Sequence, residues 1–170
     1  MSYSPRCRLV SADELEIVHE LAMQIWPKCY RRIVAPDQID AMASALFDSD
    51  RLEADMRERG QCFWLVSLAD REVGFLSASL KDGCLHISRL YVLPEYRGCG
   101  LGKALIEAAQ AHFGPVNQLS VTVNKDYTPA VEFCLRSGFN IAYELPVNLG
   151  QYGFIQYEMQ KDLRIHAKAG

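Results

Sequence analysis

The sequence predicts an α/β (α+β) fold in which helices flank a mixed, mostly antiparallel central sheet of about six to seven strands. Three observations carry this prediction. The chain has 170 residues, of which 49% are hydrophobic and 23% charged, so it can bury one core and stay soluble. Helical periodicity dominates residues 11–59, and strand-like runs dominate residues 62–92. Beyond residue 92 the two patterns alternate. We expect a single domain over residues 1–170.

Three helical patterns occupy the N-terminal part of the chain. Residues 11–14, Ser-Ala-Asp-Glu, form a capping box that starts the first helix. The apolar stripe behind it, residues 17–25, predicts a helix that ends before Pro27. Two shorter helical patterns follow at residues 38–47 and 50–59. We therefore expect helices, and no strands, between the capping box and residue 60.

Aromatic and aliphatic runs predict the next three elements as strands. The runs lie at Cys62–Leu68, at residues 73–80 and at Cys84–Val92, and short polar segments separate them. The second separating segment ends in Asp-Gly, which is a strong turn signal. Connections this short favour an antiparallel meander of three strands.

The C-terminal part alternates helix and strand. Leucine and alanine side chains on one side of residues 101–112 indicate a helix, and residues 119–123 are typical of a strand. A second helix starts at Thr128, which we expect to be its cap with a proline in the first turn. The last two strands are predicted at residues 139–145 and 154–160.

Composition excludes several classes of protein. The formal charge is −3, so the chain lacks the basic character of a nucleic-acid-binding protein. No apolar run approaches the roughly 20 residues that span a bilayer, and no apolar signal segment is visible, so we expect a cytoplasmic protein without membrane contact. The six cysteines contain no C-x-x-C pair, and the four histidines no i, i+4 pair. We therefore expect reduced cysteines and no metal site.

A glycine-rich loop between a strand and a helix carries the chemistry. The strand ends at Leu90-Tyr91-Val92, and three alternate glycines, Gly98, Gly100 and Gly102, precede the helix. Glycines allow the backbone to approach an anion, and the first helical turn points unpaired amides at the same place. Arg97 adds a planar donor group that suits phosphate. The segment therefore predicts a pyrophosphate site.

Two better-known phosphate loops do not fit this segment. A P-loop requires G-x-x-x-x-G-K-[ST], but Arg97 stands at the first glycine and Ala104 follows Lys103. A dinucleotide-binding fingerprint lies early in a βαβ unit and has an acidic residue about 20 positions further on. Here the loop follows an antiparallel meander, and the residues near Leu119 are not acidic. Nucleotide hydrolysis and hydride transfer are therefore disfavoured.

Two motifs make nearly the whole sequence resemble the GNAT-type N-acetyltransferase family. Arg97, Gly100 and Gly102 match that family's R/Q-x-x-G-x-G/A loop. Asn124 and residues 130–139 are similar to its N…A-x-x-F-Y-x-x-x-G-F segment. Residues 25–40 are also similar to a bacterial branch that includes polyamine acetyltransferases.

The resemblance implies a GNAT architecture and transfer of an acetyl group from acetyl-CoA to a primary amine by direct attack. The backbone of the strand would pair with the pantetheine arm in the gap between two parting strands, and loop amides from Arg97 to Lys103 would hold the pyrophosphate. Asn124 would bind further along the cofactor. The cofactor-binding residues implied in this way are Leu90, Tyr91, Val92, Arg97, Gly98, Cys99, Gly100, Leu101, Gly102, Lys103 and Asn124.

Two catalytic residues are candidates only. Cys134 stands where the family commonly has a tyrosine that reprotonates the CoA thiolate, and a thiol has a similar pKa to that leaving group. The alternative is a small core residue without chemistry. His86 has a suitable ordinary pKa for a general base and lies on the strand at the same parity as Leu90 and Val92. The alternatives are that His86 is a partly exposed residue of the sheet without a catalytic role, or that a chain of water molecules accepts the proton in its place. Cys99 is either a reactive thiol in the loop or a tolerated small residue.

The acceptor is predicted from charge. Seven acidic residues and two arginines lie between Asp37 and Glu58, which predicts a negative mouth that attracts a small cationic amine, although a solvated helix face explains them equally. Trp26 and Tyr30 could provide an aromatic wall. Protein lysines or N-termini are alternative acceptors, and an acyl-CoA-binding module without turnover is the alternative from another class. Dimers are common in the family, so a homodimer is left open.

Overall fold

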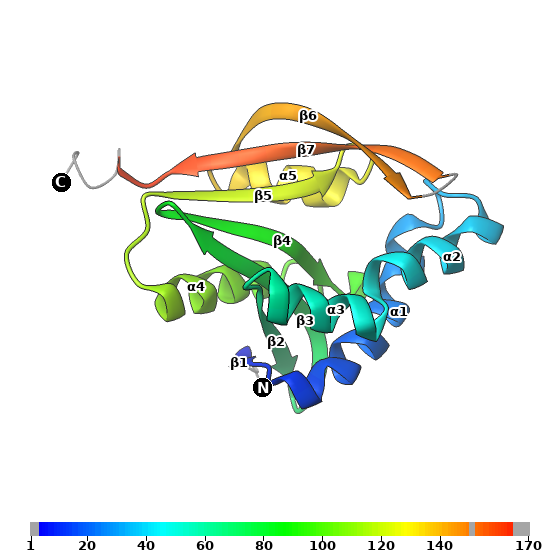
Figure 1. Ribbon diagram of the computed structural model, residues 1–170, viewed down its shortest axis with the longest axis horizontal. Helices are drawn as coiled ribbons and strands as arrows, with labels where there is room; N and C mark the ends of the chain where they lie inside the picture. Colours follow the sequence, from blue (N-terminus) through cyan, green and yellow to red (C-terminus); the bar gives the residue numbers. More distant parts are fainter. Residues whose placement is uncertain (1–3, 150–151, 165–170) are drawn as a thin grey trace.

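A seven-stranded sheet organises the protein (Figure 1). The computed structural model describes residues 4–149 and 152–164. The strand order is β1-β2-β3-β4-β5-β7-β6, and every neighbouring pair is antiparallel except β4 with β5. The strands are β1 (Arg6–Leu9), β2 (Cys62–Leu68), β3 (Arg71–Lys81), β4 (Cys84–Val92), β5 (Gln118–Asn124), β6 (Asn140–Leu149) and β7 (Tyr152–Asp162). This confirms the predicted mixed, mostly antiparallel sheet.

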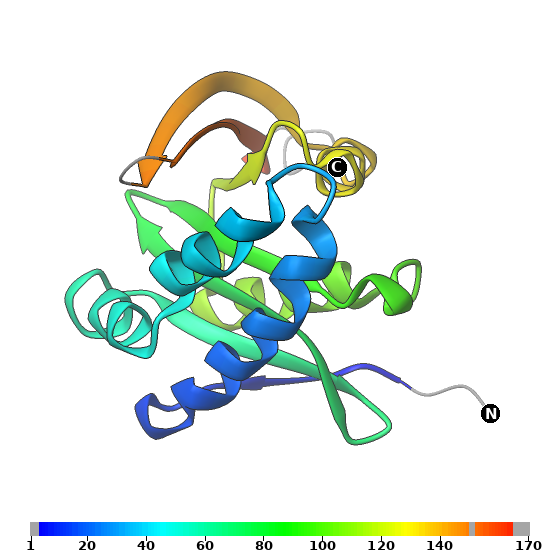
Figure 2. The same cartoon turned by 90° about the vertical axis from the view of Figure 1, so that its right-hand side faces the viewer.

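Five α-helices cover the sheet. Helices α1, α2 and α3 lie together on one side of it (Figure 2), while α4 and α5 are on the other. The helices are α1 (Leu15–Tyr30), α2 (Pro36–Phe47), α3 (Ser49–Glu58), α4 (Leu101–Phe113) and α5 (Thr128–Arg136), with short 3₁₀ turns at Ala12–Glu14 and Pro94–Tyr96. None of the helices within the described residues is long and apolar enough to cross a membrane.

The first helix is longer than its sequence predicts. We expected it to end before Pro27, but α1 continues through this proline to Tyr30. Proline removes one backbone hydrogen bond, but the turn that follows buries Cys29 and Tyr30 in the core, next to Trp26. The free energy gained by burying these two side chains outweighs the loss of the backbone hydrogen bond at Pro27. The predicted cap of α5 is also wrong by one position, since Thr128 is its first helical residue and Tyr127 its cap.

A bulge in β4 changes which side chains share a face of the sheet. Ser77 of β3 is opposite Arg89, whereas the next residue of β3, Ala78, is opposite Ile87, so Ser88 is an extra residue in β4. An extra residue shifts the alternation of side chains. His86, which is opposite Ser79, therefore shares a face with Arg89 and not with Leu90. The predicted common parity of His86, Leu90 and Val92 is wrong for this reason.

The two parallel strands separate halfway along their length (Figure 1). Residues Cys84 to Ile87 of β4 pair with Gln118 to Val121 of β5, and the pairing then stops. The second half of β4 is still bonded to β3 on its other side, up to Val92. One edge of residues 88–92 is thus left without a neighbouring strand in the described part of the sheet. Unpaired strand edges can bind an extended ligand.

Candidate active site

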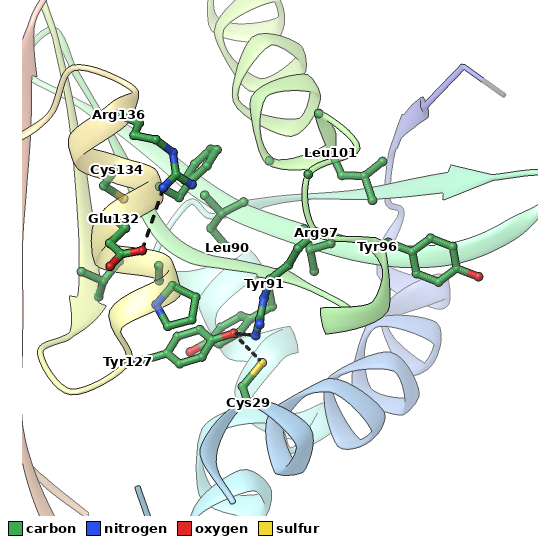
Figure 3. Close-up of a pocket in the computed structure, with 18 residues that line it drawn as sticks. Cys29, Leu90, Tyr91, Tyr96, Arg97, Leu101, Tyr127, Glu132, Cys134 and Arg136 are labelled. Carbon is green, nitrogen blue, oxygen red and sulfur yellow. Dashed lines mark hydrogen bonds and ion pairs between the residues drawn. The ribbon is translucent and has the colours of Figure 1, made fainter. Parts of the chain in front are cut away.

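The first cavity lies where β4 and β5 part, between α4 and α5 (Figure 3). Its volume is about 350 Å³, and β4, the glycine loop, both helices and the end of α1 contribute to its walls. Eight of the eleven predicted cofactor-binding residues line it: Leu90, Tyr91, Val92, Arg97, Gly98, Gly100, Leu101 and Gly102. Cys99 and Lys103 are exposed beside it and do not line it.

The glycines of the loop have two separate roles. Gly98 and Gly100 have φ of +79° and +77°, a left-handed conformation that side chains rarely adopt. Gly102 has ordinary backbone angles, but a Cβ atom there would lie 2.8 Å from Cζ of Phe133 on α5. The missing side chain therefore lets the start of α4 approach α5 closely. This contact holds the two helices together at the base of the first cavity.

The start of α4 offers backbone donors at the first cavity. The first bond inside the helix runs from the amide of Ala104 to the carbonyl of Gly100, at 3.0 Å. The amides of Leu101, Gly102 and Lys103 come before it, so the helix does not use them, and the helix dipole makes this end positive. The predicted pyrophosphate donors also included the amide of Arg97, but this amide already donates to the carbonyl of Pro94 at 3.2 Å.

The Arg97 side chain points toward α1 (Figure 3). Its guanidinium donates to the hydroxyl of Tyr127 and lies 5.6 Å from the centre of that ring. The Tyr127 hydroxyl is in turn 3.1 Å from Sγ of Cys29. Burial raises the pKa of Tyr127 well above its ordinary value. Sequence motifs do not mark Cys29, because it comes from the turn of α1 beyond Pro27 that the prediction omitted.

Cys134 is buried on α5 and lines the first cavity. Figure 3 shows its place on α5, next to Glu132 and Arg136. Burial raises the pKa of its thiol to about 12. A thiol with this pKa remains neutral near pH 7, so Cys134 is no thiolate nucleophile.

A second cavity of about 330 Å³ lies on the opposite face of the parted strands. Tyr91 borders both cavities, whereas the neighbours Val123 and Asn124 of β5 line the first and the second, respectively. Side chains alternate along a strand, so the two cavities occupy the two faces of the sheet. Asn124 is therefore away from the first cavity, and its Oδ1 accepts the amide of Asp126 at 2.8 Å.

Arg89 and Asp55 form a buried ion pair in the wall of the second cavity. Nη2 of Arg89 lies 2.7 Å from Oδ2 of Asp55, and Asp55 is only 3% exposed. Gln61 Oε1 at 2.9 Å and Ser77 Oγ at 3.3 Å accept from the other nitrogen of the guanidinium. Arg59 reaches the second carboxylate oxygen of Asp55 from the surface, at 2.5 Å. Two arginines thus share one carboxylate.

The predicted negative mouth is wrong for this cavity. Of the seven acidic residues between Asp37 and Glu58, only Asp55 lines it, and Arg51 and Arg59 line it as well. Residues four apart on a helix share a face, so Arg51 and Asp55 of α3, followed by Arg59 just beyond its end, line the cavity, whereas the other acidic residues of the stretch do not. This spacing was the signal in the sequence, which a sum of charges over the whole stretch hides.

His86 lies on the face of the second cavity but does not line it. Its Nδ1 is 2.5 Å from Oγ of Ser120 and 3.5 Å from Oε1 of Glu158, and the side chain is 38% exposed. Glu158 itself is buried, and burial raises the pKa of its carboxyl, although His86 opposes the shift. The sequence analysis did not single out Glu158, because a glutamate in a C-terminal strand carries no motif.

Comparison with known proteins identifies the class. The model of the acetyltransferase (GNAT) family matches residues 15–139. The chain therefore belongs to the GNAT family and is an acetyl-CoA-dependent N-acetyltransferase. An uncharacterized N-acetyltransferase of Mycobacterium tuberculosis strain H37Rv is 27% identical over 159 residues, which cover 91% of this chain and 99% of the relative. The peptidyl-lysine N-acetyltransferase YjaB of Escherichia coli K12 is 33% identical over 76 residues, covering 45% and 47% of the two chains.

Solved structures have the same fold. A GCN5-related N-acetyltransferase from Rhodopseudomonas palustris is 27% identical and superposes with a TM-score of 0.75, over 96% of this chain and 99% of that one. The PaiA N-acetyltransferase of Thermoplasma acidophilum, in complex with coenzyme A, is 20% identical and has a TM-score of 0.72, over 94% and 99%. The predicted GNAT architecture is thus confirmed.

Proposed function

We propose that the protein transfers the acetyl group of acetyl-CoA directly to a primary amine of a small acceptor, with the donor in the first cavity and the acceptor in the second. The observation that carries this proposal is the meeting of the two cavities at Tyr91, where β4 and β5 part. A donor on one face and an acceptor on the other can approach each other only through such a gap. Direct attack needs this proximity and no covalent enzyme intermediate.

The residues around the first cavity fit acetyl-CoA. The open edge of residues 88–92 can pair with an extended chain that carries amides, as a neighbouring strand would. Amides from Gly98 to Lys103 and the start of α4 suit a pyrophosphate. Arg97 can add a charged donor by exchanging its bond to Tyr127 for one to phosphate. Acetyl-CoA supplies the activated acetyl thioester. Of the other predicted cofactor-binding residues, Cys99 lies beside this site without lining it. Asn124 shapes the turn after β5 by accepting the amide of Asp126.

Proton transfer is assigned to His86 as a hypothesis. An alkylamine has an ordinary pKa near 10.4 and must lose a proton before it attacks. His86 does not line the second cavity, so this role requires a relay of water between its ring and the amine. If the activity of His86→Ala keeps the pH profile of the wild type, the role is refuted. Cys134 remains the candidate donor to the leaving thiolate, and its raised pKa speaks against it.

A protein acceptor is the second candidate. The similarity to the peptidyl-lysine N-acetyltransferase YjaB over 45% of the chain is the observation that favours it. A lysine side chain is long and cationic, whereas the second cavity carries more arginine than carboxylate. This lining favours a small molecule, and it also disfavours the polyamine acceptor that the negative stretch suggested. A homodimer remains a prediction from the family.

The first test of this proposal is ligand binding. We expect acetyl-CoA at 100 times its dissociation constant to stabilise the protein by about 2.7 kcal/mol, with no comparable effect of NAD or ATP. Gly102→Ala should abolish this stabilisation, because the new Cβ forces α4 away from Phe133. Gly60→Ala is a control for a destabilising glycine substitution outside the site: its φ of +65° strains an alanine there, so it should lower the stability of the free protein but leave the stabilisation by acetyl-CoA unchanged. Absence of stabilisation by acetyl-CoA would refute the donor site.

The second test is turnover. CoA release is measured with a panel of small amines, lysine peptides and peptides with free N-termini. Release with small amines supports the proposal, and release with peptides alone supports the protein acceptor. Binding of acetyl-CoA without release for any acceptor would show an acyl-CoA-binding module instead.

A further inference from the structure

We propose that the acceptor carries a carboxylate in addition to its amine, and that Arg51 and Arg59 bind this carboxylate in the second cavity. The inference rests on the proposed function and deepens it by naming the substrate class, an amino carboxylate. The acidic stretch of the sequence suggested a cationic acceptor, whereas an amino carboxylate carries a negative group as well as its amine.

The charges that line the second cavity do not balance. Arg51, Arg59 and Arg89 face a single carboxylate, that of Asp55, which leaves two net positive charges. Arg89 does not provide the free charge, because it is buried and holds Asp55, Gln61, Ser77 and the carbonyl of Leu46. The surplus therefore belongs to the two arginines nearer the surface. Such a surplus attracts an anion and repels a polyamine.

Of the three arginines that line the second cavity, Arg51 is the one without a carboxylate partner among the described residues. Its only hydrogen bond within the described part of the chain is a long one, 3.4 Å, from Nη1 to the carbonyl of Ala45. Arg59 shares Asp55 with Arg89, so one carboxylate is divided between two guanidinium groups. Both arginines line the second cavity, Arg51 from α3 and Arg59 from just beyond its end, so an anion bound there is exposed to both charges. Guanidinium groups bind carboxylates, like phosphates, with two parallel hydrogen bonds, so these arginines suit an anion of either kind.

A second, independent observation concerns Trp26. It lines the second cavity and is 2% exposed, and its Nε1 has no acceptor with good hydrogen-bond geometry among the described residues, although the hydroxyl of Tyr91 lies close enough to interact with it. An indole N–H can only donate, so a ligand that satisfies it must present an acceptor oxygen. A buried donor without an acceptor is costly. Both the charged and the neutral groups of the cavity therefore call for oxygen acceptors on the ligand.

The remaining walls describe the body of the ligand. Tyr30, Phe47 and Phe154 supply aromatic surface to the second cavity. The volume of about 330 Å³ is at the lower end of small-molecule pockets. An amine with a carboxylate and a modest apolar body fits these walls, whereas a long flexible cation does not.

The experiment compares three acceptors that differ in one group: phenylalanine, phenylalaninamide and phenethylamine. Values of kcat/KM are divided by the fraction of neutral amine at the assay pH, because the three amines differ in pKa. We expect the carboxylate to exceed the carboxamide by tenfold or more. Arg51→Gln and Arg59→Gln should each reduce this ratio at least tenfold. Arg57→Gln is the matched control, because Arg57 is on the same helix, pairs with Glu53 and does not line the cavity.

Two further arms remove ambiguity. The aminophosphonate analogue of phenylalanine distinguishes carboxylate from phosphate, and a higher rate with the phosphonate would overturn the carboxylate assignment. Calorimetric titration of the same acceptors into the protein saturated with CoA repeats the comparison without turnover. Binding of the carboxylate but not of the carboxamide supports the inference even where release of CoA fails and the proposed function falls. Turnover or binding that favours phenethylamine or the carboxamide, or an unchanged ratio in Arg51→Gln, refutes the inference and leaves acetyl transfer intact.

Discussion

Replacing Cys134 by alanine should lower kcat by less than tenfold. The thiol is buried on α5, and burial raises its pKa to about 12. A CoA thiolate has the ordinary thiol pKa of about 8.5, so proton transfer to it from Cys134 is uphill by about 5 kcal/mol. A donor with this deficit is a poor proton source, and a thiolate of ordinary pKa can leave without being protonated in the same step. The loss of one buried sulfur should cost stability about as much as one buried methylene, about 1 kcal/mol.

The assay should follow kcat and acetyl-CoA affinity together. CoA is best separated from acetyl-CoA by chromatography, because the exposed Cys99 would consume a thiol reagent. Cys62→Ala serves as the matched control, since Cys62 is half-buried on β2 and does not line the first cavity. A loss of more than a hundredfold in kcat for Cys134→Ala, at unchanged acetyl-CoA affinity, would refute the reasoning and make Cys134 the proton donor.

Two further predictions concern buried charge. Asp55→Asn leaves Arg89 buried without its counter-ion, so urea denaturation should show a loss of about 3–5 kcal/mol in the free energy of unfolding. Glu53→Gln breaks only an exposed pair and should cost less than about 1 kcal/mol; similar losses for both would contradict this view. Burial raises the pKa of Glu158 in the folded state, so folding favours the neutral carboxyl. The contribution of Glu158 to the free energy of unfolding is therefore complete below the unfolded pKa of about 4.3 and is lost as pH rises through the folded pKa. Glu158→Gln should remove this decline from denaturation midpoints measured across that window, and parallel pH curves for the two proteins would show that Glu158 does not cause it.

Local patterns predicted the elements of the fold well. Cys62–Leu68 and Cys84–Val92 have the predicted boundaries, because apolar runs between tight turns have few other ways to fold. The glycine loop is also local, since Gly98 and Gly100 adopt the left-handed backbone that only glycine accepts readily. The predicted strands and most helices, and the loop that starts α4, therefore followed from short segments.

Errors arose where distant residues decide the outcome. The turn of α1 after Pro27 forms because Cys29 and Tyr30 find a core to enter, and a proline rule cannot register this. The bulge at Ser88 depends on the register between β3 and β4, and it turns His86 to the other face. Neither feature has a signature in the segment that contains it.

The sequence by itself determined the class of this protein, because its resemblance to the GNAT family rests on two short motifs whose local geometry is set by the backbone around them. Only the tertiary structure decided the character of the second cavity, where we propose that the acceptor binds. Its walls come from helices α1, α2 and α3 and from strands β4 to β7, and the orientation of α3 selects Arg51 and Asp55 from a mostly acidic stretch, with Arg59 just beyond its end. Net charge adds up over a segment, but a ligand responds to the side chains that one helix face presents to it.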